Sequence, residues 1–267
     1  MTDVTDVADQ TDPGDHDLIP QTESREPEYQ PGKAWVRPAL QVPGLLLWGL
    51  GMVIGFFVQK PRPTPAVDMA ILEFFARNRV DWLVSVSHFI EIYDGPKVTP
   101  WLLVGALVVI FLRGHRMLAI MTVFMAALSW LPGHIAKSLY PRPRPPASID
   151  PVWKVLGDNS YPSGHTGLVA AATVAGMFAL TVLGHTRARK WWLVGGMVLV
   201  TIVGLSRMYV GVHYPSDVLG GAALATGMSL FLWPIWAGIQ AWVPLRVGFL
   251  GDTRLARRRA AEGLPAD

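Results

Sequence analysis

Residues 162–183 read PSGHTGLVAAATVAGMFALTVL, a polar, turn-forming tetrad followed by 18 residues without a charged side chain. Such an apolar run approaches the roughly 20 residues that a helix needs to cross the hydrocarbon core of a bilayer. Ser163 is a residue type favoured at helix N-caps, and Gly164 lets backbone N–H groups approach a ligand closely. The stretch therefore predicts a membrane-spanning helix over about Thr166–Leu183, directly after a polar loop.

Five further apolar runs flank this one in the sequence. They cover about Leu40–Val58, Val98–Leu112, Met117–Ile135, Trp191–Leu205 and Val218–Val243. The chain of 267 residues is 51% hydrophobic and only 16% charged, and its mean hydropathy is +0.33. We therefore predict an all-α, polytopic membrane protein with about six transmembrane helices. The second run is short, so five or seven spans remain alternatives.

The two ends of the chain differ from this apolar middle. Residues 1–32 contain nine acidic residues, one basic residue (Arg25) and few large apolar side chains, a composition typical of disorder. They lack the basic start and apolar core of a signal peptide. We predict a disordered acidic cytoplasmic tail over 1–38, a six-span membrane domain over 39–243 and a basic cytoplasmic tail over 244–267.

Residues 67–90 fit neither a tail nor a span. Apolar residues recur there at helical spacing with charged residues between them, and the apolar set is Leu72, Phe75, Leu83, Val86 and Ile90. This pattern predicts one or two amphipathic helices on the outer membrane surface. A packed extramembrane helix pair is the alternative.

Charge in the short connections predicts the orientation. Basic clusters at 113–116, 187–190 and 254–259 fall on one side of a six-span arrangement, which the positive-inside tendency assigns to the cytoplasm. Both termini then lie in the cytoplasm. The polar segments near residues 137–146, 160–165 and 206–217 lie on the opposite, extracytoplasmic side.

Composition excludes several kinds of chemistry. The chain has no cysteine, which excludes disulfides, thiol nucleophiles and cysteine metal sites. Beyond the acidic tail it carries 22 basic and 11 acidic residues, a balance that favours contact with anionic lipid headgroups or phosphate-bearing substrates. No base-stacking or groove-reading motif is visible, so we expect no nucleic-acid partner.

The first polar segment carries cations. Lys137 lies near the end of the third predicted span, and the proline-rich loop 140–146 follows it. Prolines restrict that loop and can hold Arg144 where its planar guanidinium grips phosphate oxygens. Cations at span ends can instead reach the headgroups by snorkelling. We apply that interpretation to Arg142 and not to Lys137 or Arg144.

The other two segments carry histidines. His165 follows Ser163 and Gly164 at a predicted helix N-terminus, where free N–H groups and the helix dipole favour an anion. His213 and Asp217 are four residues apart, so the carboxylate can reach the imidazole, orient it and make it a nucleophile. Simple turn and capping roles are the alternatives. Arg207 ends the fifth span, and ionisable groups at a membrane boundary are costly enough to indicate function.

The three segments together resemble a known signature. Lys137 and Arg144-Pro145 separated by six residues, then Pro162-Ser163-Gly164-His165, then Ser206-Arg207 with His213 and Asp217, are similar to the three motifs of the type 2 phosphatidic acid phosphatase superfamily. The resemblance extends over about residues 68–236. It implies that residues 39–243 form a membrane phosphatase domain.

The resemblance also implies roles. His213, oriented by Asp217, would form a phosphohistidine, and His165 would protonate the leaving oxygen and then activate water. The phosphate-binding residues would be Lys137, Arg144, Ser163, Gly164 and Arg207. It implies no metal and no cofactor. It implies a lipid phosphate as substrate, with membrane lipids around it.

Among such lipids, undecaprenyl or another polyprenyl pyrophosphate is the favoured substrate, and phosphatidic acid or phosphatidylglycerophosphate is the alternative. A non-hydrolytic phospholipid-binding transporter, a lipid-sensing scaffold and a vanadate peroxidase are the other classes. A transporter would not require the His213–Asp217 pair. The sequence leaves the oligomeric state open.

Overall fold

The computed structural model describes residues 38–94, 99–153 and 159–246. These residues form helices and no strands, which confirms the prediction of an all-α fold. Nearly all of the predicted N-terminal tail (1–38) and of the predicted C-terminal tail (244–267) lies outside the described residues.

Eight α-helices and two short 3-10 helices make up the described chain. They are η1 (Pro38–Leu40), α1 (Gln41–Val58), α2 (Ala66–Arg77), α3 (Asp81–Asp94), α4 (Thr99–Leu112), α5 (Arg116–Leu139), η2 (Ala147–Ile149), α6 (Gly164–Val182), α7 (Thr186–Tyr209) and α8 (Pro215–Arg246).

Five of these helices are long and apolar enough to cross a membrane: α1, α5, α6, α7 and the Pro215–Ile239 part of α8. They correspond to five of the six predicted spans. The remaining predicted span corresponds to α4, whose 14 residues extend about 21 Å at 1.5 Å per residue. That length is shorter than the roughly 30 Å of a bilayer core. Pro234, which lies inside the sixth predicted span, does not end α8.

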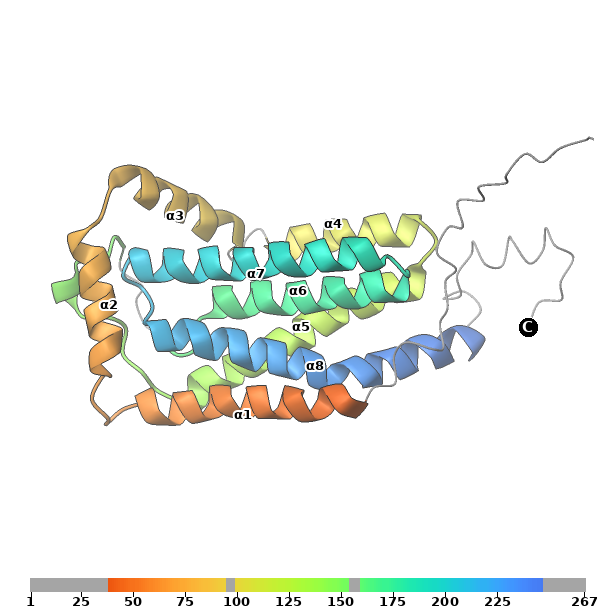
Figure 1. Ribbon diagram of the computed structural model, residues 1–267, viewed down its shortest axis with the longest axis horizontal. Helices are drawn as coiled ribbons and strands as arrows, with labels where there is room; N and C mark the ends of the chain where they lie inside the picture. The colour runs from red at the N-terminus through yellow and green to blue at the C-terminus, as the bar shows by residue number, and fades with distance from the viewer. Residues whose placement is uncertain (1–37, 95–98, 154–158, 247–267) are drawn as a thin grey trace, which may run out of the picture.

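α6 lies at the centre of the bundle and packs against α5, α7 and α8 (Figure 1). Its small residues allow this, because alanines and glycines let neighbouring backbones approach. α1 lies along α8 on one side, and α4 packs on α5 on the other. Large apolar side chains point outward from the bundle, such as Leu46 of α1 and Trp191 of α7. In a membrane protein such an apolar surface faces lipid.

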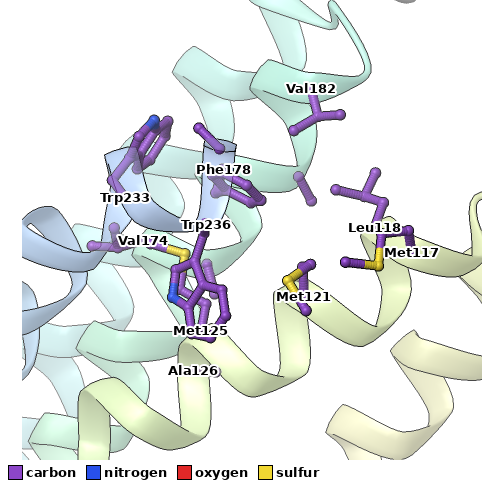
Figure 2. Close-up of a cluster of buried hydrophobic side chains, with 13 residues drawn as sticks. Met117, Leu118, Met121, Met125, Ala126, Val174, Phe178, Val182, Trp233 and Trp236 are labelled. Carbon is purple, nitrogen blue, oxygen red and sulfur yellow. The ribbon is translucent and has the colours of Figure 1, made fainter. Parts of the chain in front are cut away.

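The main apolar core lies toward the end of the bundle where α5 begins. Figure 2 shows its side chains converging from α5, α6 and α8, with Phe178 and Trp233 packed edge to face at a centroid distance of 5.3 Å. Met121 and Met125 fill the space between the larger side chains. This core fixes the three helices at one end and leaves their other ends to carry polar residues.

The segment 67–90, for which one or two helices were predicted, forms the two helices α2 and α3. α2 and α3 lie at the end of the bundle where α1 and α7 end and α8 begins (Figure 1). α3 packs on α7, and α2 contacts α7 and α8. Arg79 lies between them and donates hydrogen bonds to the carbonyl oxygens of Ile149, Asp150 and Tyr209. These bonds connect the helix pair to η2 and to the end of α7.

Candidate functional site

All three polar segments predicted from the sequence meet at one end of the bundle. Lys137 lies in the last turn of α5, His165 in the first turn of α6, Arg207 in the last turn of α7 and Asp217 in the first turn of α8. The ends of α5 and α7 and the starts of α6 and α8 share this side in Figure 1. Short connections join α6 to α7 and α7 to α8, and the longer segment 140–163 joins α5 to α6, so residues 80 positions apart gather at this end.

The loop between α7 and α8 is set by its backbone. Gly211 has a φ of +75°, a conformation that glycine adopts readily. The turn lets the N–H of Val212 donate to the carbonyl of Arg207 at 3.1 Å. Pro215 begins α8, a position where its missing N–H is not needed. His213 is thereby held just before the helix that carries Asp217.

Ser163 lies at the N-cap of α6, as predicted, but its hydroxyl lies 3.1 Å from the hydroxyl of Thr166 and makes no capping hydrogen bond. The loop is held instead by α8. The N–H of Ser163 donates to the carbonyl of Asp217 at 2.9 Å. A Cβ on Gly221 would lie 2.4 Å from the carbonyl oxygen of Ser163, so only glycine allows this approach. The second and third segments are thus packed directly against each other.

His213 has a different partner at each ring nitrogen. Nδ1 lies 3.4 Å from Oδ2 of Asp217, and Nε2 lies 3.2 Å from Nη1 of Arg144. A guanidinium can only donate, so Nε2 accepts and the ring proton is on Nδ1, facing the carboxylate. Burial lowers the pKa of His213 to about 4, although the hydrogen bond to Asp217 opposes this shift. The ring is therefore neutral at pH 7, with its Nε2 lone pair directed at a cation.

Lys137, another predicted cation, lies in the same region. The Lys137 ammonium donates to the carbonyl of Asn159 at 2.7 Å, and the Asn159 amide donates back to the carbonyl of Lys137 at 2.7 Å. Lys137 also lines a small hollow together with Ser163 and Gly164. His134, which the sequence left without a role, lines the same hollow.

Arg207 is buried, and it is held by helix α3. Its Nη1 lies 2.7 Å from Oε2 of Glu91, and its Nη2 donates to the carbonyl of Ser87 at 2.8 Å. Its Nε donates to the hydroxyl of Ser206 at 3.2 Å. The amphipathic segment predicted to lie on the membrane surface therefore contacts a candidate site residue directly.

His165 is mostly buried in the first turn of α6. Its Nε2 has no hydrogen-bond partner among the described residues, which is unusual for a buried ring nitrogen. The whole arrangement can hold an anion between fixed cations and N–H donors, with an imidazole nitrogen available for attack and a second imidazole nearby.

Comparison with known proteins agrees with this geometry. The sequence model of the PAP2 superfamily matches residues 117–240. An undecaprenyl-diphosphatase of Sulfolobus acidocaldarius is 30% identical over 165 residues, which cover 61% of this chain and 75% of that protein. The chain belongs to the PAP2 superfamily.

Two further PAP2 proteins match most of their own length. YbjG of Escherichia coli K12 is 31% identical over 195 residues, which cover 64% of this chain and 89% of that one. A crystal structure of a transmembrane PAP2 type phosphatidylglycerolphosphate phosphatase from Bacillus subtilis superposes with a TM-score of 0.62 at 25% identity, covering 74% of this chain and 95% of that one. This chain is therefore a membrane-embedded PAP2 lipid phosphatase.

The interpretation of Arg142 as a snorkelling cation is wrong for this PAP2 phosphatase. Its side chain is 1% exposed, and its guanidinium lies between the carboxylates of Asp68 and Asp217. The loop after α5 turns inward, because the carbonyl of Arg142 accepts from the N–H of Ser160 at 2.8 Å. Arg142 faces the protein interior and not the headgroups.

Three polar residues near the PAP2 motifs were not singled out from the sequence as site candidates. They are Asp68 on α2, Glu91 on α3 and Ser160 before α6. A signal for Asp68 existed, because it precedes Leu72 by four residues and so shares the buried face of an amphipathic helix. A carboxylate on such a face needs a partner. No local pattern identifies Ser160.

Proposed function

We propose that this PAP2 phosphatase removes the terminal phosphate of a lipid pyrophosphate, with undecaprenyl or another polyprenyl pyrophosphate as the favoured substrate and the monophosphate as product. The observation that carries the proposal is His213, with Nδ1 against Asp217 and Nε2 facing Arg144. The undecaprenyl-diphosphatase of Sulfolobus acidocaldarius supports this choice of lipid.

The reaction has two steps. Nε2 of His213 attacks the terminal phosphorus, a P–N bond forms and the bond to the bridging oxygen breaks while His165 gives that oxygen a proton. Water then attacks the phosphohistidine, His165 accepts the proton of the water, and inorganic phosphate leaves with His213 restored. The buried Nε2 of His165, with no partner among the described residues, supports its role as the group that moves the proton.

The negative charge of the phosphate in transfer needs fixed donors. Lys137, Arg144 and Arg207 supply cations, and Ser163 and the N–H of Gly164 at the start of α6 supply further donors. Donors fixed before the reaction stabilise developing charge without reorganising, which is a major part of catalysis at such sites. In this proposal the reaction requires no metal.

We place the site on the extracytoplasmic face. The short basic connections at 113–116 and 187–190 lie at the opposite end of the bundle from the motifs, and the positive-inside tendency assigns that end to the cytoplasm. The termini then lie in the cytoplasm. An outward site at the end of a bundle suits a lipid whose headgroup reaches the surface while its chains stay in the bilayer.

The test is phosphate release by detergent-purified protein in excess EDTA. The panel is polyprenyl pyrophosphate, phosphatidylglycerophosphate and phosphatidic acid at equal surface concentration. We expect the highest kcat/KM for the pyrophosphate. The similarity to the Bacillus subtilis structure makes phosphatidylglycerophosphate the second candidate substrate. A higher kcat/KM on that lipid than on the pyrophosphate would make it the preferred substrate. Reversible loss of activity in EDTA would reject the metal-free mechanism. Binding of these lipids without release of phosphate would favour a transporter.

Glu91 gives a prediction about substrate binding. Its carboxylate is paired with Arg207, so a substrate phosphate must compete with it for the guanidinium. Glu91 is about one-third exposed, so the pair is partly screened and the competition is modest. We expect Glu91→Gln to lower KM about fivefold, a value that corresponds to about 1 kcal/mol, with little change in kcat.

The measurement is the initial rate against substrate concentration at low and high salt. Glu73→Gln, which removes an exposed carboxylate from α2 paired with Arg77, is the matched control and should leave KM unchanged. A higher KM in Glu91→Gln would mean that Glu91 holds Arg207 in place for the substrate and does not compete with it.

A further inference from the structure

Arg142 occupies a position to which the three motifs assign no role, yet it is one of the most buried side chains among the described residues. Its Nη2 lies 2.6 Å from Oδ2 of Asp68, and its Nη1 lies 2.5 Å from Oδ1 of Asp217. All three side chains are at most 2% exposed. Its guanidinium also lies 3.9 Å from the ring centroid of Tyr214. A buried cation held in this way is costly to desolvate and needs these partners.

The contacts of Asp217 show what Arg142 does to it. Oδ1 accepts from Arg142, while Oδ2 accepts from the backbone N–H of Tyr214 at 2.9 Å and from the hydroxyl of Ser160. The same Oδ2 faces Nδ1 of His213. Both oxygens are therefore fixed, and the plane of the carboxylate cannot turn away from the imidazole.

Asp68 on α2 binds both Arg142 and the first turn of α8. Its Oδ1 accepts from the backbone N–H of Ser216 at 3.1 Å, and its Oδ2 accepts from the hydroxyl of Ser216 as well as from Arg142. Ser216 is in turn 2.7 Å from Nη1 of Arg142. The extramembrane helix α2 is thereby joined to the first turn of α8, which carries Asp217.

Arg142, Asp68 and Asp217 form a buried charged cluster beside His213, and its net charge affects the charge state of the His213 ring. One guanidinium and two carboxylates leave a net charge of −1 in a region without solvent. A neutral imidazole does not balance that charge, but an imidazole that has gained a phosphoryl group on Nε2 and kept its proton on Nδ1 is a cation at the ring. The cluster therefore favours the ring in the state that follows attack.

We propose that Arg142 and Asp68 are a positioning pair that orients Asp217 and sets the electrostatic environment of His213. Arg142 holds the carboxylate toward the imidazole, and Asp68 holds Arg142 and supplies the second negative charge. This inference rests on the proposed function of His213 as the nucleophile.

The two residues have opposite charges, so their replacement has opposite effects on the pH profile. Arg142→Gln leaves two buried carboxylates without a cation, and protons then bind to the cluster at a higher pH. We expect the acid limb of kcat/KM to move up by about one pH unit, with kcat about 10²-fold lower and KM within about threefold of wild type. Asp68→Asn leaves a single ion pair, so the acid limb should stay or move down, while kcat falls about tenfold.

Several other groups face the cluster and titrate in the same environment. The charged and titratable groups around Asp217 and His213 are Tyr161 before α6, His165 in the first turn of α6, Tyr214 before α8, Arg144 and Lys137 from the first segment, and Arg142 with Asp68. Burial raises the pKa of Tyr161 and of Tyr214, so both remain neutral throughout the acid range.

Initial rates between pH 3.5 and 8 would be measured for wild type, Arg142→Gln, Arg142→Lys and Asp68→Asn in detergent. Arg142→Lys keeps the charge and should restore the pH profile even where it restores only part of kcat. Arg79→Gln removes another arginine that ties α2 and α3 to the loops; it should lower the unfolding temperature and leave the acid limb unmoved. Glu73→Gln is the matched control for Asp68→Asn on the same helix.

An acid limb that stays in place in Arg142→Gln, or that moves in the same direction in Arg142→Gln and Asp68→Asn, would overturn the proposal and leave Arg142 a purely structural residue. If Arg142→Gln does not fold, an acid limb that moves up in Asp68→Asn or in Arg142→Lys would overturn the proposal instead. The nucleophile is tested separately by His213→Ala. An active wild type with an inactive His213→Ala and unmoved acid limbs would reject the positioning pair alone.

Discussion

Replacement of His213 by alanine is expected to lower phosphate release by at least about 10³-fold and to abolish the phosphohistidine. The imidazole is the only proposed nucleophile, and its Nε2 faces Arg144 where the phosphate would be bound. When a nucleophile is removed from an enzyme of this kind, what remains is the part of catalysis due to binding and electrostatics. Acid-labile label transferred from 32P-labelled substrate measures the intermediate, and released phosphate measures turnover.

The change should leave the fold in place. His213 lies in the turn between α7 and α8, and alanine removes the ring without touching the glycine turn at Gly211. We expect the same elution volume in detergent and an unfolding temperature within a few degrees of wild type. His185→Ala, an exposed histidine at the opposite end of the bundle, is the matched control and should keep full activity. Label on the protein in His213→Ala would identify another nucleophile.

The helices and the three polar segments could be predicted from the sequence because their signals are local. The apolar run over about Thr166–Leu183 predicts a helix that the structure places at Gly164–Val182. Hydropathy depends on neighbours within about 20 residues, and so does the spacing of His213 and Asp217 within one helical turn. The apolar periodicity of residues 67–90 likewise predicts helices.

The partners of Arg142 could not be predicted because they depend on tertiary contacts. Asp68 precedes it by 74 residues and Asp217 follows it by 75, on helices whose packing no local pattern gives. By local composition alone, an arginine in a proline-rich loop at the end of a span resembles a headgroup-binding cation. The pairing of Glu91 with Arg207, 116 residues apart, was missed for the same reason.

The second large effect is expected for Asp217→Asn, with kcat about 10³-fold to 10⁴-fold lower. In the wild type the carboxylate accepts a hydrogen bond from Nδ1–H of His213, which keeps the proton on Nδ1 and leaves Nε2 with a lone pair. An asparagine amide can turn its NH₂ toward Nδ1 and donate, which moves the ring proton to Nε2 and removes the attacking lone pair. The change also leaves Arg142 with one carboxylate, so a lower unfolding temperature is expected.

Kinetics separate the tautomer effect from the loss of stability. Substrate binding should change little, because the phosphate is held by the cations and by the N–H groups at the start of α6, and none of these is replaced. Asp217→Asn should therefore lower kcat far more than it raises KM, and the purified protein should still bind the lipid. Asp217→Glu keeps the charge and should recover part of kcat. An unchanged kcat in Asp217→Asn would make Asp217 a capping and ion-pairing residue, and the orientation of His213 would then have to come from Arg144 alone.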